Sequence, residues 1–328
     1  MNGPRIEVHS TREAGRVRRG VIEALRAGQV PTSFLYDSPG QAERWLAYHR
    51  AWSPSRRDGE VLALYGHSFR FAAQRLAAAG ARRLVGLGCG GGSKDAEAAQ
   101  ALHAAGPGPL HYVAIDASAP LVAEAMRRVR ERVPGIACHP LEADLSADPP
   151  LRDWMDARTG PAPSLFTCFG MLPNLDAARF PAYVAGLLRG DDGLLISANL
   201  SPGGFAADRS RILAQYDNPE ARAWYRGALG DLGLDERAAG LSVHAERTAP
   251  DGSAWRITVR ATVRRPVALM AYGERIPLAR GQRLCLFKSQ RFTESAAREL
   301  LAGAGLGAAT AWWDRTGEEG IFYCECAR

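Results

Sequence analysis

The stretch "RRLVGLGCGGGSKDAEAAQAL", residues 82–102, runs from a short apolar segment through five glycines into an alanine-rich segment. The apolar run is typical of a buried strand, and the alanine-rich run is typical of a helix. A glycine-rich turn at the start of a helix lets backbone amides approach a ligand closely. Three ligands suit such a turn: a dinucleotide pyrophosphate, a nucleoside triphosphate, or the amino-acid end of S-adenosylmethionine.

Four more apolar segments follow the first one, with helical patterns between them. Short apolar strands that alternate with helices predict a parallel sheet that is covered on both faces. The glycine loop follows the first strand, and sheets of this kind bind ligands at the carboxyl ends of their strands. The predicted fold class is therefore α/β and Rossmann-like. The predicted strands are residues 82–88, 110–116, 135–144, 164–170 and 193–200.

The pattern changes at Ser201. Residues 210–233 read as a helix, and apolar and polar side chains alternate through residues 255–264. This period of two is typical of an antiparallel strand with one solvated face. A second hairpin is expected through residues 273–282, followed by a helix and two strands that close the chain. Residues 201–288 therefore read as an insertion into an α/β domain that resumes directly after them.

The composition excludes several classes of protein. The 328 residues carry 41 basic and 35 acidic side chains spread along the chain, so the net charge of +6 predicts no nucleic-acid partner. No apolar run approaches the roughly 18–20 residues that cross a bilayer, and the first ten residues lack the apolar core of a secretory signal. We therefore expect a cytoplasmic protein without membrane association. The six cysteines lack the paired spacing of zinc ligands, so no metal site is expected.

Residue types after the glycines separate the three candidate ligands. A triphosphate loop needs lysine followed by serine or threonine, and the order here is Ser93, Lys94, Asp95. The dinucleotide fingerprint needs glycine at the sixth position counted from Gly88, where Ser93 stands. The triphosphate is thereby excluded, and the dinucleotide match is only partial.

S-adenosylmethionine fits the sequence best. Gly88 and Gly90 allow close approach of the backbone, and amides at the start of the following helix would face the carboxylate of the methyl donor. Asp116 ends the second strand, where a carboxylate would accept hydrogen bonds from ribose hydroxyls. Asp144 and Leu145 follow the third strand, where they would meet the amine and the ring of adenine. The sequence therefore predicts S-adenosylmethionine as cofactor.

Short motifs spread over nearly the whole chain point to one family. They are, in order, "FLYD", "PSR", "LVGLGCGGGSKD", "CFGMLPNL", "AQYDN", "ARGQ", "KSQRF" and "WW". Together they resemble the histidine-specific N-alpha-methyltransferases, which trimethylate histidine on the route to ergothioneine. The resemblance implies a class I S-adenosylmethionine-dependent methyltransferase domain (residues 56–200 and 289–328) with an inserted α+β substrate-binding domain (residues 201–288, completed by residues 10–55).

The resemblance also implies two sets of site residues. Taken alone, Asn174 after a proline is equally typical of a turn, and Tyr216 of a core position. No residue is assigned a catalytic role, because a desolvated amine can lose its proton without a dedicated base. The cofactor-binding set is Tyr36, Gly88, Gly90, Lys94, Asp116, Asp144, Leu145 and Gly170, and the substrate-binding set is Asn174, Tyr216, Phe287 and Ser289.

Three positions depart from the pattern of that family. The family carries a carboxylate in its first strand, before the glycine loop, where this chain has Gly86. A tyrosine that helps to close over histidine aligns with Ser53, and the glutamate that recognises the imidazole aligns with Phe287. A buried imidazole needs a hydrogen-bonding partner, and phenylalanine offers none. Histidine is therefore not expected to be the substrate.

These features predict an S-adenosylmethionine-dependent N-methyltransferase. Its expected acceptor is a small-molecule amine: an amino acid or an amino-acid-like intermediate of natural-product biosynthesis. The alternative is a methyltransferase-like accessory subunit of a natural-product enzyme complex, for example one that builds aziridine-containing azabicycles. Such a subunit would bind a partner enzyme and hold S-adenosylmethionine or its demethylated product without methylating.

Overall fold

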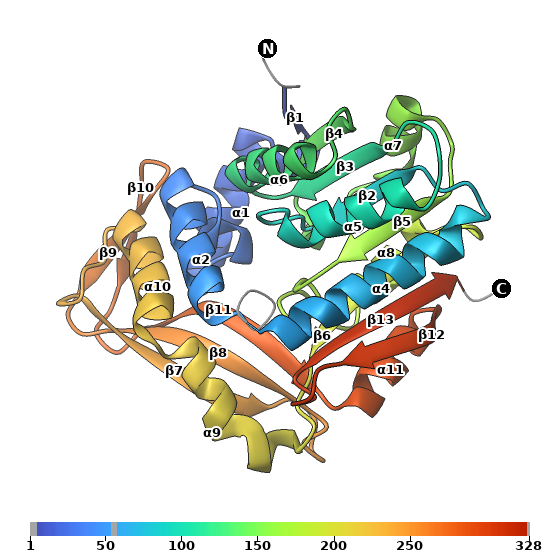
Figure 1. The fold of residues 1–328 in the computed structure, drawn as a ribbon. Coiled ribbons are helices and arrows are strands. Elements are labelled where there is room, and N and C mark those ends of the chain that lie inside the picture. The colour runs from blue at the N-terminus through green and yellow to red at the C-terminus, as the bar shows by residue number, and fades with distance from the viewer. Residues whose placement is uncertain (1–4, 54–57, 327–328) are drawn as a thin grey trace.

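The computed structural model describes residues 5–53 and 58–326 (Figure 1). The "PSR" motif, residues 54–56, lies outside the described residues. The chain forms a large sheet covered by helices on both faces, with a smaller group of helices and strands beside it (Figure 1). Within residues 5–53 and 58–326, no helix is long and apolar enough to cross a membrane.

The large sheet has eight strands in the order β1-β4-β3-β2-β5-β6-β13-β12. The first six are parallel to one another, whereas β13 is antiparallel to both β6 and β12. The central strand β2 leads into the glycine loop. The strands are β1 (Glu7–Val8), β2 (Arg83–Leu87), β3 (His111–Asp116), β4 (Ala137–Glu142), β5 (Ser164–Cys168), β6 (Gly193–Asn199), β12 (Leu306–Trp313) and β13 (Glu319–Cys326).

Alternation along the strands supplies an apolar core on each face of this sheet. Leu84 and Tyr112 pack with α4, α5 and α6, whereas their neighbours Val85 and Val113 pack with α7, α8 and α11 on the other face. The first three of these helices lie in front of the sheet in Figure 1. The six helices are α4 (Gly59–Ala77), α5 (Ser93–Ala104), α6 (Ala119–Arg132), α7 (Arg152–Thr159), α8 (Phe180–Leu187) and α11 (Glu294–Gly303).

The prediction of a Rossmann-like α/β fold is confirmed. Each of the five segments predicted as strands contains an observed strand, β2 to β6, and a helix follows the glycine loop. Because β2 to β6 are parallel, their carboxyl ends lie at one edge of the sheet.

The smaller group of elements has its own apolar core. Its side chains come from residues 17–48 and 205–287 alone. Strands β7, β8 and β11 form an antiparallel sheet, and β9 pairs with β10 in a separate hairpin. The elements are α1 (Ala14–Arg26), α2 (Pro39–Trp52), α9 (Gly204–Tyr216), α10 (Pro219–Asp231), β7 (Ala239–Arg247), β8 (Ala254–Val263), β9 (Val267–Ala271), β10 (Glu274–Leu278) and β11 (Arg283–Phe292), with 3-10 turns at Ser10–Arg12, Thr32–Leu35 and, in the larger group, Leu145–Ala147.

Two details differ from the sequence predictions. The helix predicted for residues 210–233 is broken into α9 and α10, because Asn218 caps a new helix and Pro219 stands at its first position. Proline has no backbone N–H to continue α9, and its ring disfavours helical geometry in the preceding residue. The hairpin predicted through residues 273–282 turns earlier, at Tyr272 and Gly273, which both have positive φ.

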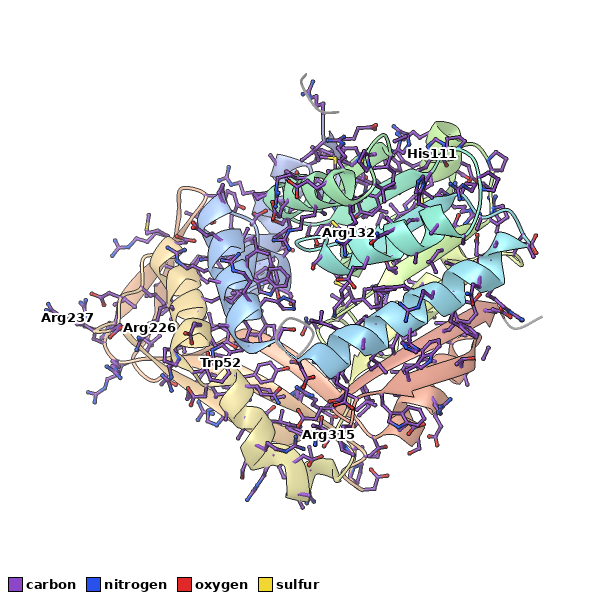
Figure 2. All side chains as sticks on the ribbon, viewed as in Figure 1. Trp52, His111, Arg132, Arg226, Arg237 and Arg315 are labelled. Atoms are coloured by element: carbon purple, nitrogen blue, oxygen red, sulfur yellow. The ribbon has the colours of Figure 1, made fainter. Side chains whose placement is uncertain are left out.

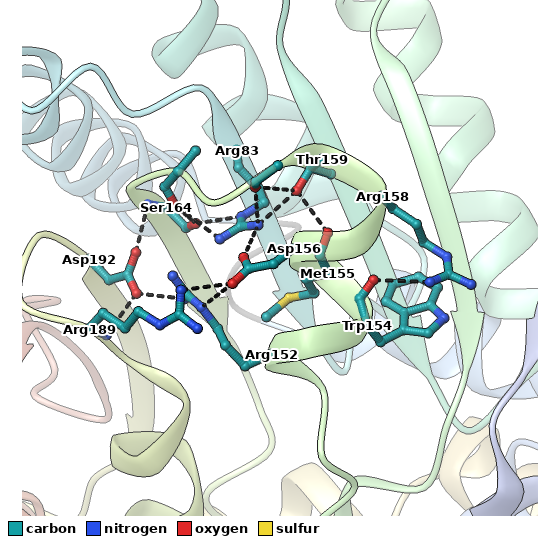
Figure 3. Close-up of polar contacts among 12 residues, drawn as sticks. Arg83, Arg152, Trp154, Met155, Asp156, Arg158, Thr159, Ser164, Arg189 and Asp192 are labelled. Atoms are coloured by element: carbon teal, nitrogen blue, oxygen red, sulfur yellow. Dashed lines mark hydrogen bonds and ion pairs between the residues drawn. The ribbon is translucent and has the colours of Figure 1, made fainter.

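Opposite the carboxyl ends, a polar network fixes the amino-terminal edge of the sheet (Figure 3). Arg83, which begins β2, is fully buried. Its guanidinium donates to Asp156 Oδ1 on α7 at 2.8 Å and to Ser164 Oγ on β5 at 2.6 Å. Asp192, just before β6, accepts from the Ser164 amide at 2.8 Å and from Arg152 at 2.7 Å. The network thus joins β2, α7, β5 and the approach to β6.

Asp156→Ala tests this network. The substitution leaves the buried guanidinium of Arg83 with neutral partners only, so the free energy of unfolding should fall by about 3 kcal/mol. Urea denaturation measures the change. Asp153→Ala, at an exposed position of the same helix, is the matched control and should change stability by less than about 0.5 kcal/mol. Equal stability of the two variants would contradict a structural role for the network.

Candidate functional site

A cavity of about 430 Å³ opens at the carboxyl ends of the parallel strands. Its walls come from the residues that follow β2, β3, β4 and β5, from the end of β6, and from α2, α9, α10 and β11 of the smaller group. The structure brings all twelve residues predicted for the site to this one cavity. They are Tyr36, Gly88, Gly90, Lys94, Asp116, Asp144, Leu145, Gly170, Asn174, Tyr216, Phe287 and Ser289.

The glycine loop needs its glycines for conformation and for space. Gly88, Gly90 and Gly92 have φ of 68°, 51° and 67°, a region that favours glycine. A Cβ on Gly92 would also lie 2.3 Å from Cα of Ala125 on α6. The loop therefore passes close to its neighbours and delivers the start of α5, at Ser93, to the cavity wall.

Asp116, at the end of β3, fixes the loop from the side. Its carboxylate accepts hydrogen bonds from the amides of Gly90 at 2.9 Å and Ser118 at 3.0 Å. Burial raises the pKa of Asp116 to about 6, and these amide bonds counteract the rise. Each oxygen accepts one amide bond and keeps a lone pair for a further donor such as a hydroxyl.

Asp144 and Leu145 form the wall next to Asp116. Asp144 Oδ1 caps the short 3-10 turn by accepting from the amide and the hydroxyl of Ser146, at 2.9 and 2.6 Å. Its second oxygen lies outside that cap. Leu145 is buried and adds an apolar surface beside the carboxylate. The pair thus combines a carboxylate oxygen with an apolar wall, as the adenine prediction requires.

Lys94 is held at the opposite wall by two residues that the sequence did not single out. Its ammonium donates to the hydroxyl of Tyr65 at 2.8 Å and lies 3.8 Å from Glu319 Oε1. The same hydroxyl donates to Glu319, and the ammonium lies 4.0 Å from the Tyr65 ring centroid. Burial raises the pKa of Tyr65 well above its usual value, so this hydroxyl stays protonated.

The space beside Gly86 is filled by the carboxylate of Asp95, from the first turn of α5. A Cβ on Gly86 would lie 2.2 Å from Asp95 Oδ2. Asp95 is buried and accepts from the hydroxyls of Tyr112 at 2.7 Å and Thr167 at 2.8 Å. Burial raises its pKa to about 6, against the effect of these two hydroxyls. A buried carboxylate therefore stands beside the first strand even though the strand itself carries glycine.

The end of the cavity predicted to bind the acceptor combines hydroxyls with aromatic rings. The Tyr216 hydroxyl lies 3.0 Å from Ser289 Oγ, and both side chains are buried. The Phe287 ring stacks on Tyr216 with centroids 6.1 Å apart and meets Trp224 edge-on at 5.5 Å. Asn174 donates to the carbonyl of Gly170 at 2.8 Å.

Tyr36 and α2, from the amino-terminal part of the chain, form one wall of the cavity. The Tyr36 ring contacts Trp45 and Trp224, with centroids 5.6 and 5.4 Å apart, and its backbone carbonyl accepts from Ser118 Oγ at 2.7 Å. Figure 2 shows Trp52 at the end of α2, where its indole donates to Glu220 of α10 at 2.7 Å. Segments far apart in the sequence thus meet at the rim of one cavity.

Three further residues line the cavity without having been predicted from the sequence: Asp95, Asn199 and Arg291. Asn199 had a signal, because it is the last residue of a parallel strand, as Asp116 is. Arg291 stands two residues after Ser289 in the same strand, where alternation places both side chains on one face. Asp95 gave no such signal, because only the folded chain brings it beside Gly86. Over the described residues, no group of three or more His, Cys, Asp or Glu side chains is placed to hold a metal ion.

The strand order, with an antiparallel seventh strand inserted beside β6, and the glycine loop after β2 define the class: a Rossmann-like, class I methyltransferase. The model of the histidine-specific, S-adenosylmethionine-dependent methyltransferases matches residues 17–326, and the chain belongs to this family. Its cofactor is S-adenosylmethionine. A search of curated proteins found no match.

Several solved methyltransferases share a distant likeness. The mitomycin 7-O-methyltransferase MmcR is 17% identical, with a TM-score of 0.40 over 96% of this chain and 69% of its own. Magnesium protoporphyrin IX methyltransferase from Synechocystis PCC 6803 is 13% identical, with 0.43 over 89% and 96%. Human N-acetylserotonin methyltransferase is 13% identical, with 0.42 over 97% and 69%. With values this low, the family match and the strand order alone define the fold.

Asp116→Asn should weaken binding of S-adenosylhomocysteine, because the amide replaces the charged group that we predict to accept hydrogen bonds from the ribose hydroxyls. We expect a loss of about 1.5–3 kcal/mol in binding free energy. In the parent protein the affinity should fall as the pH drops below about 6, where Asp116 takes up a proton. The ligand's own amino and carboxyl groups titrate mainly outside pH 5–7. Calorimetry at pH 5.0 to 7.5 should show this fall in the parent and a flatter profile in the variant.

A double-mutant cycle tests whether side chains at positions 86 and 95 compete for the same space. Gly86→Ala alone should destabilise the fold, because its methyl group would overlap the Asp95 carboxylate. In an Asp95→Ala background the same substitution should cost at least about 1 kcal/mol less. Urea denaturation of the four proteins gives this coupling. Additive effects would show that the two positions do not compete for one space.

Proposed function

We propose that the chain is an N-methyltransferase that acts on an amino acid or an amino-acid-like natural-product intermediate other than histidine. Membership of the S-adenosylmethionine-dependent family supports methyl transfer. The observation that favours an amine acceptor is Asn174: its Oδ1 is buried and has no hydrogen-bond partner among the described residues. A buried acceptor of this kind is costly when unpaired, and an amine N–H would satisfy it.

The cofactor, when bound, supplies a methyl group on a positively charged sulfur. The work left to the chain is to hold a neutral amine in line with that methyl group and to keep water away. Asn174 would accept an N–H of the amine and so aim the nitrogen lone pair. The rings of Tyr36, Trp45 and Trp224 line the cavity and limit access of water. Desolvation favours the neutral form of the amine, so no dedicated base is required.

Phe287 supports the exclusion of histidine. Its ring is packed among Tyr216, Trp224 and Tyr225 and offers no hydrogen-bond acceptor. An imidazole N–H directed at this wall would lose its bond to water and gain none, which costs about 1–3 kcal/mol. Ser53, also on the cavity wall, is too short to close over the ligand as a tyrosine would.

We further propose that residues 56–200 and 289–328 hold the cofactor, and that residues 10–55 and 201–288 form the substrate-binding domain. The separate apolar core of residues 17–48 and 205–287 supports this division. The proposed acceptor residues Tyr216 and Phe287 belong to the second part. Ser289 follows in β11, the strand that runs on towards the large sheet.

L-histidine at millimolar concentration should give no methyl transfer above background. Release of S-adenosylhomocysteine measures turnover, and mass spectrometry of the histidine pool detects methylated product. Phe287→Glu should tighten binding of histidine by restoring an acceptor for the imidazole. Robust trimethylation by the parent protein would show that the acceptor pocket has been misassigned.

A panel of amino acids and other small amines tests N-methyl transfer itself. We expect turnover with at least one acceptor, and a large loss of that turnover in Asn174→Ala with little change in S-adenosylhomocysteine affinity. Tight binding of S-adenosylhomocysteine without turnover on any amine would contradict the proposal. It would favour instead the accessory subunit that binds a partner enzyme.

A further inference from the structure

Arg291 of β11 is a buried cation at the acceptor end of the cavity. Its side chain is 4% exposed. The guanidinium donates to the Leu200 carbonyl at 3.2 Å, to Gln215 Oε1 at 3.0 Å and to the Tyr216 hydroxyl at 3.4 Å. Its Nε has no partner in the described part of the chain. All of its direct partners are therefore neutral, which is unfavourable for a buried charge.

The nearest acidic side chain along this network is already engaged. Glu318 accepts from Gln215 Nε2 at 2.6 Å and is paired with Arg211, which also contacts Asp208 at 2.9 Å. The amide of Gln215 thus stands between Glu318 and the guanidinium. Arg211 lies half exposed, whereas Arg291 faces the cavity.

The hydrogen bonds around Arg291 favour one direction for two hydroxyl protons. The Tyr216 oxygen accepts from Arg291 Nη2 and from Asn199 Nδ2, each at 3.4 Å, and Asn199 Nδ2 also donates to Ser289 Oγ at 3.5 Å. Because both acceptor positions of Tyr216 are used, we assign its hydroxyl as the donor to Ser289 Oγ, 3.0 Å away. The proton of Ser289 is then directed away from Tyr216. Since Ser289 lines the cavity, this network presents a hydroxyl donor to the ligand, with a cation behind it.

We propose that the end of the acceptor remote from the reacting amine carries a carboxylate, which accepts a hydrogen bond from the Ser289 hydroxyl and has Arg291 as its counter-charge. This inference deepens the proposed function and rests on it for the position of the amine. The side wall, formed by Phe287, contributes no competing acceptor. The charge of Arg291 and the direction of the Ser289 hydroxyl together favour an oxyanion over an imidazole N–H at this end of the cavity.

L-glutamate and L-glutamine form a matched pair of probes, because they differ at the remote end only. Calorimetry with saturating S-adenosylhomocysteine should show that glutamate binds about tenfold more tightly than glutamine, or better. Arg291→Met should abolish this preference, Arg291→Lys should retain part of it, and Ser289→Ala should weaken glutamate alone. Affinity for S-adenosylhomocysteine should stay unchanged in all three variants, which shows that they fold.

Equal binding of the two probes, binding of neither, or an unchanged preference in Arg291→Met would overturn the inference. An additional arm with the side-chain sulfonate L-homocysteate separates carboxylate selectivity from binding of oxyanions in general: equal affinity for homocysteate would contradict the carboxylate. Because these measurements need no turnover, absence of methyl transfer on any amine would remove the proposed function and leave this result intact.

Discussion

The rest of the site depends on the close packing of the glycine loop against its neighbouring helices. At Gly90, Gly91 and Gly92 a Cβ would lie 3.1 Å from Trp45, 2.7 Å from Leu46 and 2.3 Å from Cα of Ala125. The bare backbone thus lets α2 of the smaller group and α6 of the large sheet pack against one turn. Glycine here joins the two groups of elements as well as opening the loop to a ligand, and the cavity exists because both meet there.

Both ends of the cavity hold charged side chains whose direct hydrogen-bond partners are neutral. At the end proposed for the cofactor, Asp95 accepts hydrogen bonds from two hydroxyls and Asp116 accepts them from two backbone amides. Burial raises the pKa of both carboxyl groups to about 6. Arg291 donates to a carbonyl, an amide and a hydroxyl at the other end. Such groups destabilise the empty protein. A cationic sulfonium and an anionic acceptor would each recover part of that cost.

The sequence predicted the frame of the molecule because the frame follows from local patterns. Apolar runs of strand length predicted β2 to β6, and Asp116 and Asp144, the polar residues predicted at the ends of such runs, line the cavity. The break between α9 and α10 was also local, in Asn218 and Pro219, but the surrounding helical pattern concealed it.

The features of the site that could not be predicted from the sequence depend on contacts between residues far apart in the chain. Gly86 taken alone reads as the loss of a carboxylate, yet Asp95 occupies the same space from the next helix. Tyr65 and Glu319 are 254 residues apart and meet only around Lys94. Arg291 looks like one more basic residue until its burial and its neutral partners are known. In each case the missing information is which side chains share a volume.

The two ends of the cavity also differ in how freely they can change. Steric limits constrain the end proposed for the cofactor, because Asp95 and Ala125 occupy the space that a side chain at Gly86 or Gly92 would need. The end proposed for the acceptor rests on side chains of β11 that line the cavity, and Phe287 pairs with Val259 of β8 directly after a register shift between Cys285 and Phe287. Substitution of a single side chain in this strand can change the pocket without rebuilding the fold. In this chain, the wall formed by β11 presents the charge of Arg291 and the apolar ring of Phe287 to the cavity.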